Sequence, residues 1–276
     1  MLSILLHLIA AALYAGLAVV SWRSRQRDPS FSHRASGLNV WQHAGLLAAL
    51  LTHGAALGGE LFASQAMHFG FSIAVSTILW LAIAFYWIES FYARMEGLQM
   101  LGLPVAAVGV LLPLIFPGQR LLANVDSGQF RLHFLIAMLA YSLFTLAALH
   151  AVLMAIVERS LHRGRLTPLL AGLPPLLTME KLLFRLIHIA FALLTLTLAT
   201  GMLFSESLFG KAVTFNHKTD FAIASWLIFA ILLAGRHFAG WRGRTALRWT
   251  LSGFGALVLA YVGYRFVLEV ILGRTA

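Results

Sequence analysis

The stretch that decides the fold is Leu132–Val157, which reads LHFLIAMLAYSLFTLAALHAVLMAIV and contains no Asp, Glu, Lys or Arg. A run of about 20 apolar residues can cross the roughly 30 Å hydrocarbon core of a bilayer as a helix. Seven further stretches of this kind flank it. We therefore predict an all-α polytopic membrane protein, a bundle of eight transmembrane helices at residues 2–22, 38–58, 69–92, 97–116, 132–157, 183–204, 219–234 and 246–272.

Positive charge predicts the orientation of these helices, because cytoplasmic loops hold an excess of Lys and Arg. The segments after the first, third, fifth and seventh stretches carry 14 of the 20 Lys and Arg residues, the opposite side carries 5, and Arg265 lies inside the last stretch. This distribution predicts that both termini lie outside. Arg265 and Glu269 are four residues apart in the last stretch, so we expect them to form an ion pair.

Composition excludes several classes of protein. The chain has 276 residues, is 60% hydrophobic and 11% charged, and has a mean hydropathy of +0.85, as is typical of a polytopic membrane protein. Its net charge of +10 lies mostly in the predicted cytoplasmic loops, so we expect membrane lipids and not nucleic acid as its partner. The absence of cysteine excludes disulfides and haem attachment through a C-x-x-C-H motif on this chain.

The loops between the stretches are too short to bury a core of their own. We therefore predict a single transmembrane domain over residues 1–276. Residues 1–22 lack a basic first region and a small-residue cleavage site, so we interpret them as a retained first helix and not as a removed signal peptide.

Eleven histidines are the candidate chemistry of this chain. Imidazole is a common ligand of metals and of haem iron, and polar groups at membrane depth are costly enough to suggest function. The predicted topology places His53, His68, His133 and His217 on the outer side. His53, His133 and His217 come from different elements, and we predict that they converge on an outer pocket in which two of them ligate haem iron. The alternative is that each is an interfacial histidine that bonds backbone or water.

A second group of histidines lies on the predicted inner side. His150, His188 and His43 form a possible inner haem site there, which would suit transfer across the bilayer. The sequence holds no H-E-x-x-H, no Walker A lysine loop and no G-x-S-x-G motif, so zinc-protease, nucleotide and hydrolase chemistry find no support. Whether the protein is an enzyme therefore stays open.

Three motifs in the C-terminal half carry a resemblance to a known family. They are Ala192-Leu-Leu-Thr-Leu-Thr-Leu-Ala-Thr-Gly201, the run from Phe209 to Trp226, and Gly240-Trp241-Arg242-Gly243. Together with the His133…Tyr141-Ser142 segment, they are similar to the cytochrome c assembly family, the CcsA- and HemX-type haem-handling membrane proteins. Members share an LLTxGxxxG helix, an external tryptophan-rich loop and a cytoplasmic GWRG turn.

The likeness is good over about residues 130–270 and looser over 38–60. Within it, Thr52-His53-Gly-Ala-Ala-Leu and Met179-Glu180-Lys181 resemble the smaller YpjD-like branch of inner-membrane proteins. The resemblance implies a location in the bacterial inner membrane, a haem cofactor and partners among other cytochrome c biogenesis proteins.

The departures from the family pattern bear on the haem site. The family's tryptophan signature stacks on haem, but this chain has Phe209, Val213, Phe215, Asn216 and Phe221 in place of its tryptophans and its aspartate. His133 matches one family ligand, whereas two other family histidines fall on Ala234 and near Ile271. A second outer ligand must then come from His53 or His217, a choice that rests on topology and not on the family.

Two main interpretations follow. The first is an inner-membrane accessory protein that binds or moves haem b non-covalently through His133 and a second outer histidine, with Phe215, Phe221 and Trp226 against the porphyrin. The second is a non-enzymatic scaffold or regulatory subunit that retains the fold without haem. A small-solute transporter is a third, weaker interpretation, because no internal repeat is visible.

Overall fold

The computed structural model describes residues 1–27, 38–61, 67–93, 96–117, 125, 127–164, 173–209 and 217–273. All its regular elements are helical. They are α1 (Leu2–Arg27), α3 (Val40–Leu61), α4 (Phe71–Glu89), the 3-10 turn η1 (Glu96–Leu98), α5 (Gln99–Gly109), α6 (Leu112–Ile115), α7 (Gly128–His162), α9 (Leu176–Phe209), α10 (His217–Ala239), α11 (Arg244–Val258), the π-helical turn η2 (Leu259–Gly263), α12 (Tyr264–Phe266) and the π-helical turn η3 (Val267–Ile271).

Seven helices in the described residues are long and apolar enough to cross a membrane, which confirms the all-α membrane architecture. The fourth predicted stretch is different, because α5 and α6 together form only a shorter apolar helix over Gln99–Ile115. Pro104 lies inside α5 and Pro113 lies in the first turn of α6, and proline removes a backbone donor from a helix. Eight full crossings therefore remain a prediction.

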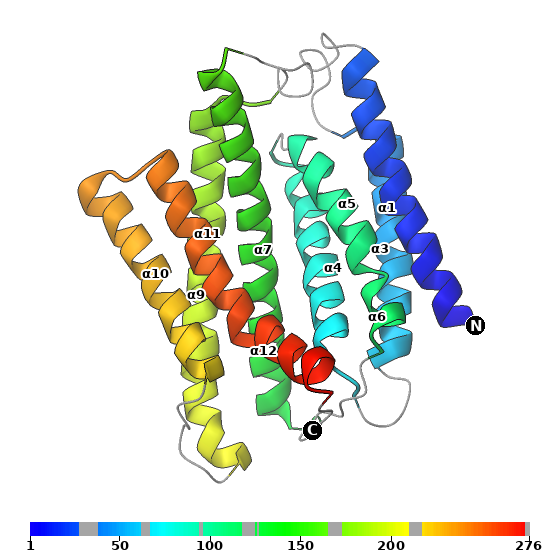
Figure 1. The fold of residues 1–276 in the computed structure, drawn as a ribbon, viewed down its shortest axis with the longest axis vertical. Helices are drawn as coiled ribbons and strands as arrows, with labels where there is room; N and C mark the ends of the chain where they lie inside the picture. The colour runs from blue at the N-terminus through cyan, green and yellow to red at the C-terminus, as the bar shows by residue number, and fades with distance from the viewer. Residues whose placement is uncertain are drawn as a thin grey trace.

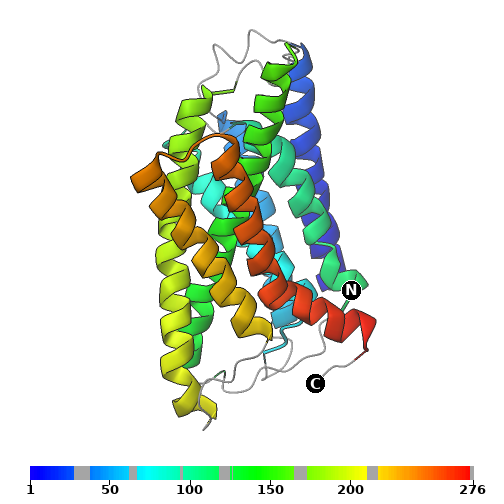
Figure 2. The same cartoon turned by 60° about the vertical axis from the view of Figure 1, so that its left-hand side comes forward.

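The helices form two groups that meet along the middle of the molecule (Figure 1). In the first group α1 packs against α3 and α5, and in the second group α7 packs against α9 and α11 while α10 packs against α11. The contact between α4 and α7 joins the two groups. Helix α1 begins and η3 ends toward the same end of the bundle (Figures 1 and 2), as an even number of crossings requires.

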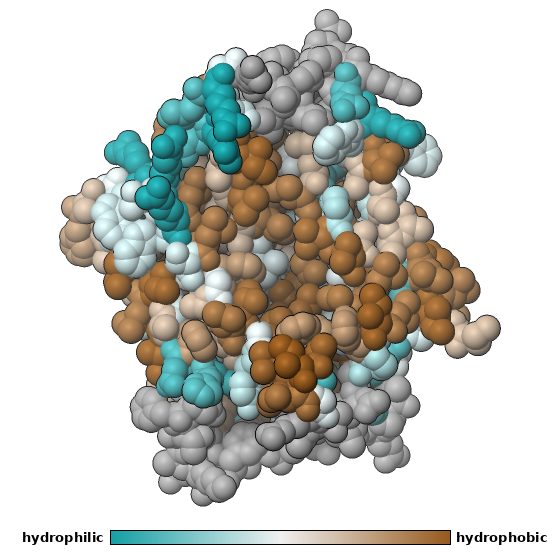
Figure 3. All heavy atoms as spheres, in the orientation of Figure 1, coloured by the Kyte–Doolittle hydropathy of each residue, from teal (hydrophilic) through white to brown (hydrophobic). Residues whose placement is uncertain are grey.

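The surface carries a band of apolar side chains between two more hydrophilic ends (Figure 3). Exposed side chains such as Leu5, Val20, Ile189 and Leu203 contribute to the apolar surface. An apolar surface of this extent is unsuited to water, so it faces the hydrocarbon core of the bilayer.

Helix α1 combines a lipid-facing surface with a polar inner face. Leu5, Leu8 and Val20 are exposed, whereas His7, Tyr14 and Ser21 are buried. The Ser3 hydroxyl donates to Glu60 Oε1 (2.5 Å), and the Ser21 hydroxyl donates to Gln99 Oε1 (2.5 Å). Hydrogen bonds across helix interfaces hold membrane helices together where no hydrophobic driving force exists between them. The polar face therefore fixes α1 on α3 and α5.

Candidate functional site

His133 lies half-buried near the start of α7, against α9. Its Nδ1 is 2.9 Å from the Thr200 hydroxyl, which itself donates to the Leu196 carbonyl (2.7 Å). Because that hydroxyl gives its only proton to the carbonyl, it accepts from His133 Nδ1–H. The imidazole is then the Nδ1–H tautomer, and its Nε2 carries a lone pair. Among the described residues nothing hydrogen-bonds this Nε2, so it is available to an external partner.

His133 packs closely on α9, and the residue after it, Phe134, belongs to a group of aromatic rings. A Cβ atom on Gly201 would lie 3.3 Å from His133 Cε1, so the glycine lets the ring approach the helix. Phe134 stacks on Phe130 (5.9 Å between ring centroids) and meets Phe69 edge to face (4.8 Å). The sequence predicted a functional His133, and the structure adds the groups that set its tautomer and orientation.

His53 lies in a different environment from His133. Its side chain is fully buried in α3, its Nδ1 is 3.3 Å from the Tyr14 hydroxyl on α1, and its Nε2 is 2.9 Å from the Ser76 hydroxyl on α4. Both ring nitrogens therefore have partners inside the helix bundle. A ligand role would require one of these hydrogen bonds to break.

We expect His53→Ala to destabilise the protein, because it leaves a cavity and removes the partner of both the Tyr14 and Ser76 hydroxyls. The loss in unfolding free energy should be roughly 2–4 kcal/mol. Thermal unfolding of the detergent-purified protein measures it. His162→Ala is the control, because His162 is exposed and, among the described residues, bonds only the Glu158 carbonyl of its own helix. Equal melting temperatures for the two variants would contradict the structural role of His53.

The other outer candidates lie around α10. His217 is the exposed first residue of α10, Phe221 is 39% exposed, and Phe215 lies outside the described residues. The indole N–H of Trp226 donates to the Thr195 hydroxyl (2.9 Å), and its ring stacks on Phe191 (5.6 Å). No described contact brings His53, His133 and His217 together. His133 and Trp226 both bond α9, whereas His53 bonds α1 and α4.

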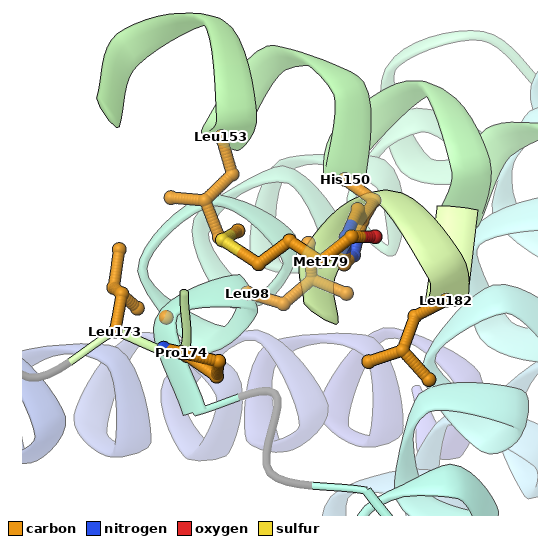
Figure 4. A pocket seen from close by; sticks show the side chains of 8 residues that line it. Leu98, His150, Leu153, Leu173, Pro174, Met179 and Leu182 are labelled. Carbon is orange, nitrogen blue, oxygen red and sulfur yellow. The ribbon is translucent and has the colours of Figure 1, made fainter. Parts of the chain in front are cut away.

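The buried member of the predicted inner group, His150, lines a small cavity near the start of α9 (Figure 4). Its Nε2 donates to the Met179 carbonyl (2.9 Å), and its buried Nδ1 has no hydrogen-bond partner in the described part of the chain. The cavity has a volume of about 10 Å³, which is room for roughly one water molecule. Leu98, Leu153 and Leu182 line it, so the imidazole is its polar group.

The remaining inner candidates lie apart from His150. His188 is exposed on α9 and its Nδ1 donates to the Phe184 carbonyl one turn earlier (2.7 Å). His43 lies on α3, where its ring stacks on Phe91 at 4.3 Å between centroids. No described contact joins the three inner histidines, so the structure offers them as separate positions and not as one cluster.

The end of the bundle that holds His150 also contains an ion-pair network that the sequence did not reveal. Glu180 is 6% exposed and its Oε1 is 2.6 Å from Arg236 Nη1 on α10. Its Oε2 accepts the backbone N–H of Gly243 (3.2 Å), in the turn between α10 and α11. Gly240 and Gly243 have φ values of +64° and +56°, which explains their identity in that turn. Glu180, which belongs to the Met179-Glu180-Lys181 motif, thus holds the GWRG motif in place.

A larger cavity of about 340 Å³ lies between α4, α5, α7 and α11. Apart from Tyr141 and Thr145 its lining is apolar, and the Thr145 hydroxyl already donates to the Tyr141 carbonyl (2.8 Å). No histidine lines this cavity, and the described residues contain no cluster of three metal-ligating His, Asp or Glu side chains. It suits an apolar chain such as a lipid tail better than an iron centre.

Comparison with known proteins places this chain in a family. A family model described as "Cytochrome C assembly protein" matches residues 40–272, which include every helix except α1. "Inner membrane protein YpjD" of Escherichia coli (strain K12) is 29% identical over 166 residues, covering 60% of this chain and 62% of that protein. "Cytochrome c biogenesis protein CcsA" of Prochlorococcus marinus (strain MIT 9515) is 34% identical over 89 residues, covering 32% and 28%.

A third relative, "Uncharacterized 28.8 kDa protein in nifR3-like 5'region" of Azospirillum brasilense, is 37% identical over 144 residues, covering 51% of this chain and 52% of the relative. The chain thus spans less than two thirds of the length of these relatives, and no solved structure matches it. Its apolar helices and its inner-membrane relative make it a multi-pass protein of the bacterial inner membrane. From residue 40 to residue 272, the chain belongs to the cytochrome c assembly protein family.

Proposed function

We propose that this protein binds or moves haem b non-covalently at the outer side of the inner membrane, as an accessory in cytochrome c biogenesis. Family membership supports the role in biogenesis. The single observation that carries the haem assignment is the 2.9 Å contact between His133 Nδ1 and the Thr200 hydroxyl. Because this hydroxyl also donates to the Leu196 carbonyl, we assign the proton to Nδ1, which leaves Nε2 for a ligand. Metal-ligating histidines usually have their second nitrogen fixed by such a partner.

The residues around His133 fit a haem group. A haem iron accepts imidazole nitrogens as axial ligands, and its porphyrin offers two flat apolar faces. His133 supplies the nitrogen, and the stacked rings of Phe130 and Phe134 belong to the same part of α7. Trp226 and Phe221 on α10 are our further candidates for the porphyrin faces, together with Phe215. With haem bound, these residues would hold and orient the group and limit the access of water to the iron.

For the second axial ligand we favour His217 over His53. His217 is exposed at the start of α10, nine residues before Trp226, which bonds α9. His53 has both ring nitrogens hydrogen-bonded inside the bundle, so ligation by His53 would cost one of these buried hydrogen bonds. On the inner side, we propose that His150, His188 and His43 are successive contacts for haem that crosses the membrane.

The test is the haem content of the purified protein. We expect wild-type protein, produced under haem-replete conditions, to show a Soret band and a pyridine haemochrome typical of haem b. His133→Ala should remove the band, and Thr200→Val should weaken haem affinity roughly 10- to 100-fold, because the hydroxyl orients the ligand. His162→Ala is the matched control, since this exposed histidine lies at the other end of the same helix.

Two outcomes decide between the interpretations. Well-folded wild-type protein without haem would favour a scaffold or regulatory subunit that retains the fold alone. If wild type and His133→Ala bind haem equally well, the protein binds haem but His133 is not its ligand.

A further inference from the structure

Arg265 is the most deeply buried cation among the described residues, at 2% exposure. Its Nε and Nη1 atoms have no hydrogen-bond partner in the described part of the chain. The ion pair expected with Glu269 is present, but Nη1 lies 3.8 Å from Glu269 Oε1, which is too long for a hydrogen bond. A buried guanidinium with unused donors is costly, and such a group calls for an unassigned partner.

Glu269 is occupied by a different element. Its Oε2 accepts the backbone N–H of Phe71 (2.9 Å), which is the first residue of α4. A carboxylate at a helix N-terminus satisfies an unpaired N–H and interacts favourably with the helix dipole. Glu269 therefore positions α4 and gives Arg265 only a distant counter-charge.

The backbone around Arg265 is irregular on both sides. The three-residue helix α12, which contains Arg265, lies between the π-helical turns η2 and η3. Such turns are rare within α-helices and occur frequently at functional sites. They widen the helix where the guanidinium is held.

Aromatic rings run between the helix that carries Arg265 and the helix that carries the proposed haem ligand. Tyr261 lies one turn before Arg265, and its ring centroid is 6.1 Å from that of Phe69. Phe69 in turn meets Phe134 (4.8 Å), the residue next to His133. Tyr261, four residues before Arg265, and Phe134, the residue after His133, therefore belong to one aromatic cluster with Phe69.

A second cation lies beside the same helix. Lys218, which follows His217 at the start of α10, has its Nζ 4.5 Å from the centroid of the Tyr264 ring. The Arg265 guanidinium carbon is 6.0 Å from that centroid on the same ring. The end of the bundle that holds His133 thus combines flat apolar groups with two positive charges, which suits a flat apolar molecule that carries carboxylates.

We propose that Arg265 binds a carboxylate of the porphyrin, one of the two propionates, and so fixes the in-plane orientation of the ring. This inference rests on the proposed function and names a second anchor for the same ligand. Arginine suits the role because its planar donors match a carboxylate, and because it stays charged where burial would discharge a lysine. Lys218 lies on the rim of the same site and adds to its positive potential.

The test separates carboxylate recognition from iron ligation by comparing three probes on the full-length protein in detergent. They are haemin, iron-free protoporphyrin IX and protoporphyrin IX dimethyl ester, and binding is followed by absorbance or porphyrin fluorescence. We expect wild type to bind the iron-free diacid at least about tenfold more tightly than its diester. Arg265→Gln should abolish this preference while the Soret shift with haemin, which reports His133, persists at higher haemin concentration.

Arg248→Gln is the matched control, because Arg248 is an exposed arginine on α11 and should leave the preference unchanged. If Arg265→Gln does not fold, Arg265→Lys and the wild type itself still provide a test. A wild type that binds the iron-free diacid no more tightly than the diester overturns the proposal. A wild type that shows no preference for the diacid but still binds haemin would reject the carboxylate anchor and leave the proposed function standing. A wild type that binds none of the probes would overturn both.

A lipid phosphate is the other anion that could bind Arg265, and a second pair of measurements distinguishes it from a porphyrin carboxylate. Wild type is assayed in nanodiscs of neutral phosphatidylcholine and in nanodiscs that contain anionic phosphatidylglycerol. A diacid preference that persists in both supports a porphyrin carboxylate. A preference lost in phosphatidylglycerol assigns Arg265 to the lipid headgroup and overturns the proposal.

Discussion

Replacing Glu180 by alanine is expected to lower the unfolding free energy by about 3 kcal/mol, the size seen when one partner of a buried ion pair is removed. Two contacts are lost, the 2.6 Å pair with Arg236 and the bond from the Gly243 N–H. Arg236 then remains against Phe184 (4.6 Å to the ring) with the Trp241 carbonyl as its other partner. Thermal unfolding in detergent and the level of protein in the membrane measure the effect.

The chain offers a matched control for Glu180 at the same turn. Glu158 also pairs with a residue beside the GWRG motif, because its Oε1 is 2.8 Å from Arg244 Nε. The Arg244 side chain is 60% exposed, however, so water and salt screen this pair. Glu158→Ala should cost at most about 1 kcal/mol. Equal losses for the two variants would show that the turn does not depend on Glu180.

The large features of the fold were predictable because they follow from hydrophobic length alone. The long helices lie where apolar runs were found, and α7 covers the whole of the predicted stretch 132–157. Hydropathy could not predict that α7 continues to His162, since the added residues are mostly polar and lie beyond the apolar run. In the fourth stretch the structure has a shorter apolar helix over Gln99–Ile115, in which α5 continues through Pro104 and Pro113 lies in the first turn of α6. A full crossing there stays a prediction.

The candidate site was predictable only in part, for a different physical reason. Charge and hydropathy place a residue at a depth in the membrane, but they carry little information on which helices are neighbours. His53 and His133 were assigned to one pocket by depth. Their described hydrogen bonds go to Tyr14 and Thr200 on different helices, so their convergence stays a prediction. Likewise Glu180 and Gly243 belong to two motifs that were noticed separately, and only packing reveals their contact.

Gly253→Ala should destabilise the protein and Gly255→Ala should not, although both glycines lie in α11, two residues apart. In a helix interior, alanine is favoured over glycine by roughly 0.5–1 kcal/mol. No atom lies within 4 Å of a Cβ at Gly255, so that variant should keep the gain or stay neutral. A Cβ at Gly253 would lie 2.8 Å from Phe229 Cε2 and 3.1 Å from Ile228 Cγ2, which is too close for packed atoms.

The ring that meets Gly253 cannot easily move away. Phe229 is fully buried and stacks on Phe144 of α7 at 4.0 Å, and the Gly253 carbonyl accepts the Ser225 hydroxyl (2.9 Å). Overpacking of this kind typically costs about 1–3 kcal/mol, so Gly253→Ala should lower the melting temperature. Adding Phe229→Leu removes the ring, and the double variant should be more stable than the two single effects predict. Additive effects would mean that α10 and α11 tolerate a wider separation, and that Gly253 does not set the distance between them.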